Sequence, residues 1–132
     1  MIEKNKFAIL IEDEPIHQYI TKKFLKQTGA FADIKVFSDG KDAFDEMLIL
    51  QNNSDQLPDI ILLDLNMPVW TGWDFLDAFK ELDIYKKVTI VILTSSQAEE
   101  DRIHATKYGL GDQFIVKPLS KDAALVVLDF LQ

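Results

Sequence analysis

Residues 60–63 read Ile-Ile-Leu-Leu, an unbroken apolar run between Asp59 and Asp64. A half-buried strand alternates apolar and polar side chains, whereas this run has no polar face. Strands that are apolar on both faces are typical of parallel sheets with helices on both sides. We therefore expect residues 59–63 to form an inner strand of such a sheet.

Four further apolar runs alternate with stretches of helical spacing along the chain. In those stretches apolar residues recur every three or four positions, which favours five helices. Strands that alternate with helices over short connections form a parallel sheet covered on both faces. The pattern therefore predicts a doubly wound α/β fold. The further strands are expected at residues 7–11, 34–37, 88–93 and 114–116.

The first and last helices carry boundary signals. Pro15 suits a first helical position, and Ile16, Ile20 and Phe24 would follow it as one buried stripe. The last helix would begin after Ser120, an N-cap residue, and is apolar around more of its circumference than one sheet-facing stripe needs. This excess is either covered by neighbouring structure or belongs to a partner or dimer surface.

Composition limits the size and the chemistry of the fold. The 132 residues are 48% hydrophobic, enough for the core of one domain, and we expect residues 1–132 to form it without an output domain. The absence of cysteine excludes disulfides, thiol catalysis and cysteine-based zinc sites. A formal net charge of −8 disfavours nucleic acid as a partner. No apolar run is long enough for a membrane span or a secretory signal, so we expect a cytoplasmic location and no membrane partner.

Polar side chains follow the predicted strands at the ends where parallel sheets place their binding sites. Glu12 and Asp13 follow the first strand, and Asp64 follows the third. Thr94 follows the fourth and Lys117 the fifth. Each residue alone has an ordinary explanation, such as a helix cap or a solvated surface charge. Their coincidence at one sheet edge favours a functional site.

Three carboxylates at one edge need a compensating charge, because two of them about 5 Å apart repel by about 3 kcal/mol. Oxygen ligands without thiolates favour Mg²⁺, with Mn²⁺ or Ca²⁺ as substitutes. A carboxylate beside such a cation and a lysine is a competent nucleophile for a phosphoryl group. The residues therefore favour phosphoryl transfer at this edge.

The residues after the strands belong to four motifs: Ile-Leu-Ile-Glu12-Asp13-Glu-Pro, Asp59-Ile-Ile-Leu-Leu-Asp64-Leu-Asn66-Met-Pro68, Ile-Leu-Thr94-Ser-Ser and Phe114-Ile-Val-Lys117-Pro118-Leu. In this order they resemble the motifs of response-regulator receiver domains of two-component signalling, of the stand-alone, chemotaxis type. The resemblance covers essentially the whole chain. It implies a flavodoxin-like, five-stranded sheet with strand order 2-1-3-4-5 and five helices.

The resemblance implies a chemical role for each matched residue. Asp64 would accept a phosphoryl group from a phosphohistidine, with Lys117 and Thr94 as the other catalytic residues. Glu12 stands where the family more often has aspartate, which changes the reach of the carboxylate but not its charge. The implied Mg²⁺ ligands are Glu12, Asp13, Asp64 and, through its backbone carbonyl, Asn66.

The resemblance also implies a conformational switch. Thr94 and Phe114 would move together on phosphorylation, although Phe114 lacks the hydroxyl of the tyrosine that is commoner there. The peptide bond before Pro118 would be cis. Asn66 and Ser96 would tune the rate of dephosphorylation.

The implied function is that of a single-domain response regulator. Its partners would be a histidine kinase or a histidine phosphotransfer protein, an unidentified downstream protein and, in one arrangement, a second copy of the chain. Phosphorylation would switch a surface on the fourth helix, fifth strand and fifth helix. It would not be a turnover enzyme, since only Mg²⁺-dependent self-phosphorylation and slow autodephosphorylation are expected.

Other functions fit the residues less well. A phosphatase of the haloacid dehalogenase type needs an aspartate two residues after the nucleophile, where this chain has Asn66. A flavin or nucleotide carrier needs a phosphate-binding loop after the first strand, where this chain has acids. The alternative that stays open is a pseudo-receiver that only binds proteins.

Two tryptophans and two histidines lie near the predicted motifs. We expect Trp73 to cover the loop after Asp64, whereas Trp70 could either cover that loop or contact a kinase. His17 and His104 are expected to be ordinary, partly exposed histidines.

Overall fold

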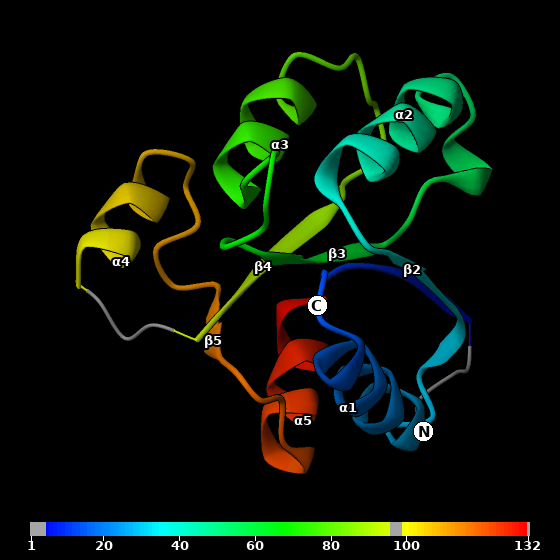
Figure 1. Cartoon of the computed structure of the whole chain (residues 1–132). Helices are drawn as coiled ribbons and strands as arrows, with labels where there is room; N and C mark the ends of the chain where they lie inside the picture. Colours follow the sequence, from blue (N-terminus) through cyan, green and yellow to red (C-terminus); the bar gives the residue numbers. More distant parts are fainter. Residues whose placement is uncertain (1–4, 96–98, 132) are drawn as a thin grey trace.

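The computed structural model describes residues 5–95 and 99–131. A five-stranded sheet with the order β2-β1-β3-β4-β5 forms its centre (Figure 1). All neighbouring strands run parallel, which confirms the predicted doubly wound fold and its strand order. The strands are β1 (Lys6–Ile11), β2 (Phe31–Phe37), β3 (Ile60–Asp64), β4 (Thr89–Thr94) and β5 (Phe114–Val116).

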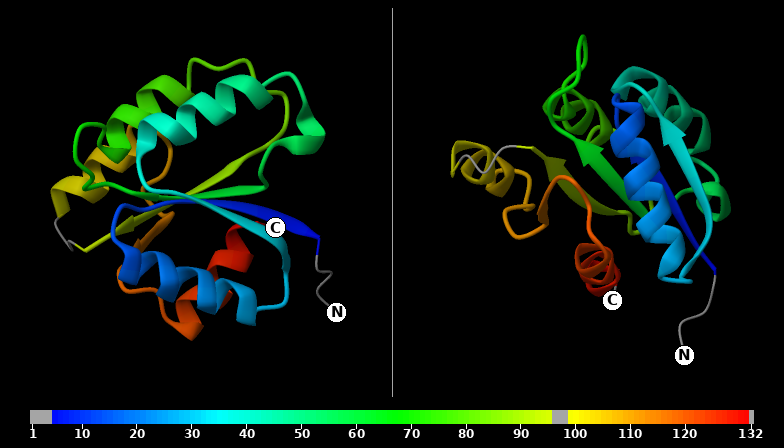
Figure 2. Two further views of the ribbon diagram at one scale, coloured as in Figure 1. Left: turned by 45° about the vertical axis from the view of Figure 1, so that its right-hand side comes forward. Right: turned by 60° about the horizontal axis from the view of Figure 1, so that its bottom comes forward.

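Five α-helices in the described part of the chain cover the two faces of the sheet (Figure 2). One hydrophobic core lies under α2, α3 and α4, and the other lies under α1 and α5. None of the helices within residues 5–95 and 99–131 is both long and apolar enough to cross a membrane. The helices are α1 (Pro15–Gln27), α2 (Gly40–Leu50), α3 (Gly72–Phe79), α4 (Glu99–Thr106) and α5 (Lys121–Phe130), and a 3₁₀ turn, Ser54–Gln56, precedes β3.

The run of four apolar residues in β3 serves both cores. Ile61 and Leu63 pack on the side of α2 and α3, and Ile60 and Leu62 pack on the side of α1 and α5. All residues of β3 are buried, as predicted for an inner strand of a parallel sheet. Asp64, the last residue of β3, is therefore carried by one of the most rigidly packed elements of the fold.

The helix boundaries confirm two predicted signals. Pro15 lies in the first turn of α1. The side chain of Ser120 caps α5, since its hydroxyl oxygen accepts a hydrogen bond from the backbone N–H of Ala123 at 3.0 Å. On α5, Ala124 is buried, whereas Leu125 and Val126 are exposed, so neighbouring structure covers only part of its apolar circumference.

The predicted buried stripe of α1 is wrong at its first residue. Ile16 is 72% exposed, and Ile20 and Phe24 are only partly buried. The sheet-facing line instead runs through Thr21 and Leu25, which are fully buried. A count of apolar residues misses this line because threonine has a polar hydroxyl.

Four of the five strands also have boundaries that differ from the expectation by one to three residues. β2 begins at Phe31 and not at residue 34. The pairing of β2 with β1 shifts register between Lys6 and Phe7, and the first residues of β2 therefore lack the alternation of buried and exposed side chains that indicates a strand. α3 ends at Phe79, and in the turn that follows it the backbone N–H of Leu82 donates a hydrogen bond to the carbonyl of Phe79.

The start of α3 lies directly against the end of β3. A Cβ atom on Gly72 would lie 2.6 Å from the carbonyl oxygen of Asp64 and 2.9 Å from the Cα of Leu65. The backbone N–H of Gly72 donates a hydrogen bond to the carbonyl of Leu65 at 3.0 Å. Only glycine permits this approach, so the segment that follows Asp64 is tied closely to the strand that carries it.

Gly72→Ala should lower the free energy of unfolding by about 1–3 kcal/mol, since backbone atoms have to move apart. Gly40 also begins a helix and is a matched control, because a Cβ there would meet its nearest atom at an ordinary 3.5 Å. Gly40→Ala should change stability by less than about 0.5 kcal/mol. Urea denaturation measures both changes, and equal losses in the two variants would contradict the close approach.

Candidate functional site

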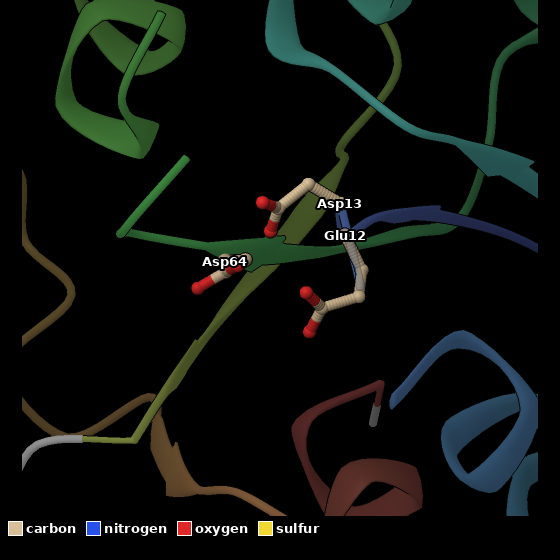
Figure 3. A group of neighbouring side chains, drawn as sticks. All are labelled: Glu12, Asp13 and Asp64. Carbon is tan, nitrogen blue, oxygen red and sulfur yellow. The ribbon is translucent and has the colours of Figure 1, made fainter. Parts of the chain in front are cut away.

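The carboxyl ends of β1 and β3 bring three carboxylates together. Ile11 pairs with Leu63, so Glu12 and Asp64 continue the two strands as neighbours. Figure 3 shows Glu12, Asp13 and Asp64 at this edge. One carboxylate oxygen from each residue lies within 4.8 Å of those of the other two. The cluster that the sequence predicted at this sheet edge is therefore formed.

Burial makes it costly in free energy to keep all three carboxylates charged. Glu12 is fully buried, Asp64 is 1% exposed, and Asp13 is half-buried. The Oδ1 atom of Asp13 is buried and has no hydrogen-bond partner among the described residues. A buried carboxylate oxygen without a partner is costly, and a hard cation is the partner that oxygen ligands of this kind favour. The three residues can therefore hold a metal ion.

Lys117 supplies a positive charge next to Glu12 and Asp64. Its Nζ atom lies 2.9 Å from Oε1 of Glu12 and 3.4 Å from Oδ2 of Asp64, and its side chain is 5% exposed. The backbone N–H of Lys117 donates to the carbonyl of Thr94 at 2.7 Å, which aligns the end of β5 with the end of β4. The peptide bond between Lys117 and Pro118 is cis, as the family resemblance implied. One ammonium against three carboxylates leaves the cluster negative.

Two pKa shifts follow from this arrangement. Burial, together with the hydrogen bond and charge of Glu12, raises the pKa of Asp64 to about 7, although the N–H of Asn66 and the ammonium of Lys117 act in the opposite sense. Burial alone would lower the pKa of Lys117, but the hydrogen bond with Glu12 and the charge of Asp64 outweigh it and raise this pKa. Lys117 is therefore charged at neutral pH, and protonation of Asp64 competes with any cation that binds there.

Of the other four predicted residues, three lie in the described part of the chain. Thr94 ends β4 and is fully buried. The side chain of Asn66 is exposed, and its backbone N–H donates to Oδ1 of Asp64 at 3.2 Å. Phe114 pairs with Ile92 and is half-buried at the start of β5. Ser96 lies outside the described residues.

The loop after Asp64 contains a strained residue that the sequence analysis missed. Val69 has a φ of 68° and is 96% exposed. A β-branched residue rarely adopts this left-handed conformation, and such strain is often found beside functional sites. The next residue, Trp70, packs its ring 5.7 Å from that of Phe44, so this loop contacts α2.

Gln18 is a second residue that the sequence analysis missed. Its side-chain amide donates to the backbone carbonyl of Glu12 at 2.6 Å and to the hydroxyl of Ser38 at 3.2 Å. It thereby connects the end of β1 with α1 and with the turn after β2. No sequence pattern indicates this role, because the partner is a backbone atom. His17, by contrast, lies outside the carboxylate cluster and 3.6 Å from Glu14, as expected of an ordinary histidine.

Comparison with known proteins identifies this constellation. A family model for the response regulator receiver domain matches residues 8–129. The chain belongs to this family. It is therefore a receiver domain of the two-component response regulators. Receiver domains bind Mg²⁺ at an acidic pocket, and Glu12, Asp13 and Asp64 form a cluster that can hold a metal ion.

Individual relatives of this receiver domain support the assignment. The two-component response regulator ORR1 of Oryza sativa subsp. japonica is 32% identical over 119 residues, which cover 87% of this chain and 51% of the rice protein. A Methanothrix harundinacea protein described as a probable methanogenesis regulatory protein, FilR2, is 28% identical over 85% of this chain and 72% of its own. A two-component response regulator from Cytophaga hutchinsonii shares the fold, with a TM-score of 0.84 over 98% of both chains at 24% identity. This chain therefore spans about half the length of the rice regulator.

The pKa of Asp64 makes a prediction about stability without metal. Because this pKa lies above the ordinary 3.8, unfolding releases a proton, and the contribution of Asp64 to stability is lost as the pH rises through about 7. Asp64→Asn removes this loss, so its stability relative to the wild type should grow by roughly 2–3 kcal/mol between pH 5 and pH 8.

Urea denaturation in the presence of a chelator measures this difference. Asp33→Asn, which changes an exposed carboxylate on β2, serves as the control and should give a difference that is the same at both pH values. An equally constant difference for Asp64→Asn would show that the carboxylate cluster does not raise the pKa of Asp64.

Proposed function

We propose that this receiver domain is a cytoplasmic phosphoacceptor that takes a phosphoryl group onto Asp64 in a Mg²⁺-dependent reaction. The donor would be a phosphohistidine of a histidine kinase or of a histidine phosphotransfer protein. The observation that carries this proposal is the position of the Asp64 carboxylate, which is buried between two acids and the ammonium of Lys117. Family membership supports the same chemistry.

The residues at the sheet edge fit a Mg²⁺ ion. Glu12, Asp13 and Asp64 would hold it with the backbone carbonyl of Asn66, and Mn²⁺ or Ca²⁺ would substitute. The unpartnered Oδ1 of Asp13 supports this assignment. When bound, the cation offsets the negative charge of the carboxylates and of the transferring phosphoryl oxygens.

The two oxygens of Asp64 have different partners, which orients the nucleophile. Oδ1 accepts the N–H of Asn66, and Oδ2 lies 3.4 Å from the ammonium of Lys117. One carboxylate oxygen would form the new P–O bond while the P–N bond of the phosphohistidine breaks and its electron pair returns to the imidazole. Lys117 would then contact a phosphoryl oxygen, and the hydroxyl of Thr94 would donate to another.

Phosphorylation would be read out on the surface formed by α4, β5 and α5. Thr94 and Phe114 would move together and alter this surface. Exposed apolar side chains on it, Ile103, Val116 and Leu125, supply contacts for a downstream protein or for a second copy of the chain. Asn66 and Ser96 would tune the slow autodephosphorylation, and we propose no other turnover.

Incubation with acetyl phosphate and Mg²⁺ should add one phosphoryl group to the protein, seen in its intact mass. Asp64→Asn should abolish the addition because its amide is not a nucleophile for phosphorus at neutral pH. Asp55→Asn is the matched control, since it changes an exposed carboxylate and should leave labelling unchanged. An unmodified wild-type mass, or equal labelling of Asp64→Asn, would contradict the proposal and favour a pseudo-receiver that only binds proteins.

Asp13→Asn should weaken Mg²⁺ binding at least about tenfold, because it removes a ligand charge. The adjacent Glu14→Gln removes an exposed carboxylate outside the cluster and should leave the affinity within about twofold. The measurement is the rise of the thermal midpoint with Mg²⁺ concentration, which reports binding to the folded state. A similar loss of affinity in both variants would place the ion elsewhere.

A further inference from the structure

The helix α4 is weakly anchored to the rest of the receiver domain. Of its eight residues, only Ala105 is buried. Two side chains of α4, Arg102 and His104, contact aromatic rings on neighbouring elements. Residues two positions apart in an α-helix point about 200° apart around its axis. The two contacts therefore lie on opposite sides of α4.

The first contact is a group of three neighbouring rings, Trp73, His104 and Tyr108, which we term the ring stack. Trp73 on α3 and His104 on α4 have ring centroids 4.0 Å apart and planes inclined by 18°. Tyr108, just after α4, lies 5.7 Å from each of the other two rings. Its hydroxyl donates to Oδ1 of Asp77 at 2.7 Å. The ring stack therefore joins α4 to α3, and it includes His104, which is partly exposed as expected.

The second contact joins α4 to β5. The guanidinium of Arg102 lies 5.6 Å from the centroid of the Phe114 ring. Arg102 is the single arginine of the sequence. A guanidinium at this distance is attracted to the face of an aromatic ring, and this attraction favours the contact of α4 with β5.

One contact ends on the helix that begins beside the backbone of Asp64, and the other ends on the strand that leads to Lys117. Trp73 follows Gly72, whose backbone packs against the carbonyl of Asp64. Phe114 begins β5, and the same strand leads to Lys117. The helix therefore bridges the segment after Asp64 and the strand that positions Lys117.

We propose that Arg102 and His104 are positioning residues that couple α4 to the phosphoacceptor site through these two contacts. The inference rests on the proposed function, since phosphorylation of Asp64 would shift the balance between the contacts and with it the position of α4. It adds a connection through α3 that does not involve Thr94. A single ring contact of this kind changes an equilibrium by about two- to tenfold, which biases the helix without locking it.

Amide hydrogen exchange of the unphosphorylated protein tests how strongly each contact stabilises α4. His104→Ala and Arg102→Ala should each speed exchange in α4 by about two- to tenfold, whereas α1 and β3 should keep their rates. His104→Phe keeps a stacking ring and should restore slow exchange. Lys107→Ala, which removes an exposed cation close to Tyr108, is the control and should leave exchange unchanged.

Tryptophan fluorescence tests the coupling itself. The chain has two tryptophans, so Trp70→Phe leaves Trp73 as the single reporter of the ring stack. Beryllium fluoride with Mg²⁺, used as a phosphoryl mimic, should change the Trp73 emission in this background. Adding His104→Ala should reduce that response at least about twofold, and adding Lys107→Ala should preserve it.

The outcomes separate this inference from the proposed function. Normal labelling of Asp64 by acetyl phosphate, with the same Trp73 response in the presence and absence of His104→Ala, would overturn the coupling alone. Unchanged α4 exchange in both alanine variants would also overturn it. Absence of labelling in every variant would overturn the proposed function and the coupling together.

Discussion

The contact between Lys117 and the two buried acids Glu12 and Asp64 is the interaction on which the site depends. Its distances of 2.9 and 3.4 Å require that β1, β3 and β5 all end at one edge of the sheet. Breaking such an arrangement by removing one partner would leave uncompensated charge on buried side chains. The single ammonium leaves excess negative charge, however, and this excess is what makes a divalent cation a fitting ligand.

The inner strands of this receiver domain are more firmly packed than the helix α4. β3 and β4 are buried along their whole length, so the carboxylates and Thr94 are held at the ends of elements that resist local opening. On α4, by contrast, a single buried residue and two ring contacts oppose displacement. The proposed chemistry at the sheet edge and the proposed movement of α4 would therefore involve elements of different stability.

The sheet and the carboxylate cluster could be predicted because each follows from local rules. The apolar run at 60–63 indicates a parallel sheet, and the topology of such a sheet then places Glu12, Asp13 and Asp64 at one edge. The roles of the individual site residues came from the family resemblance and stay predictions.

The details that sequence reasoning missed depend on contacts between distant segments. The burial of Thr21 in place of Ile16 reflects how α1 sits on the sheet. The hydrogen bond of Gln18 to a backbone carbonyl, and the stacking of His104 on Trp73, join residues whose proximity appears only after folding.

The site also has a consequence for biosynthesis, because its parts come from residues 12–13, 64 and 117. A nascent chain cannot complete the charge cluster until the last of these segments has left the ribosome, so modification of Asp64 would have to follow translation of nearly the whole domain.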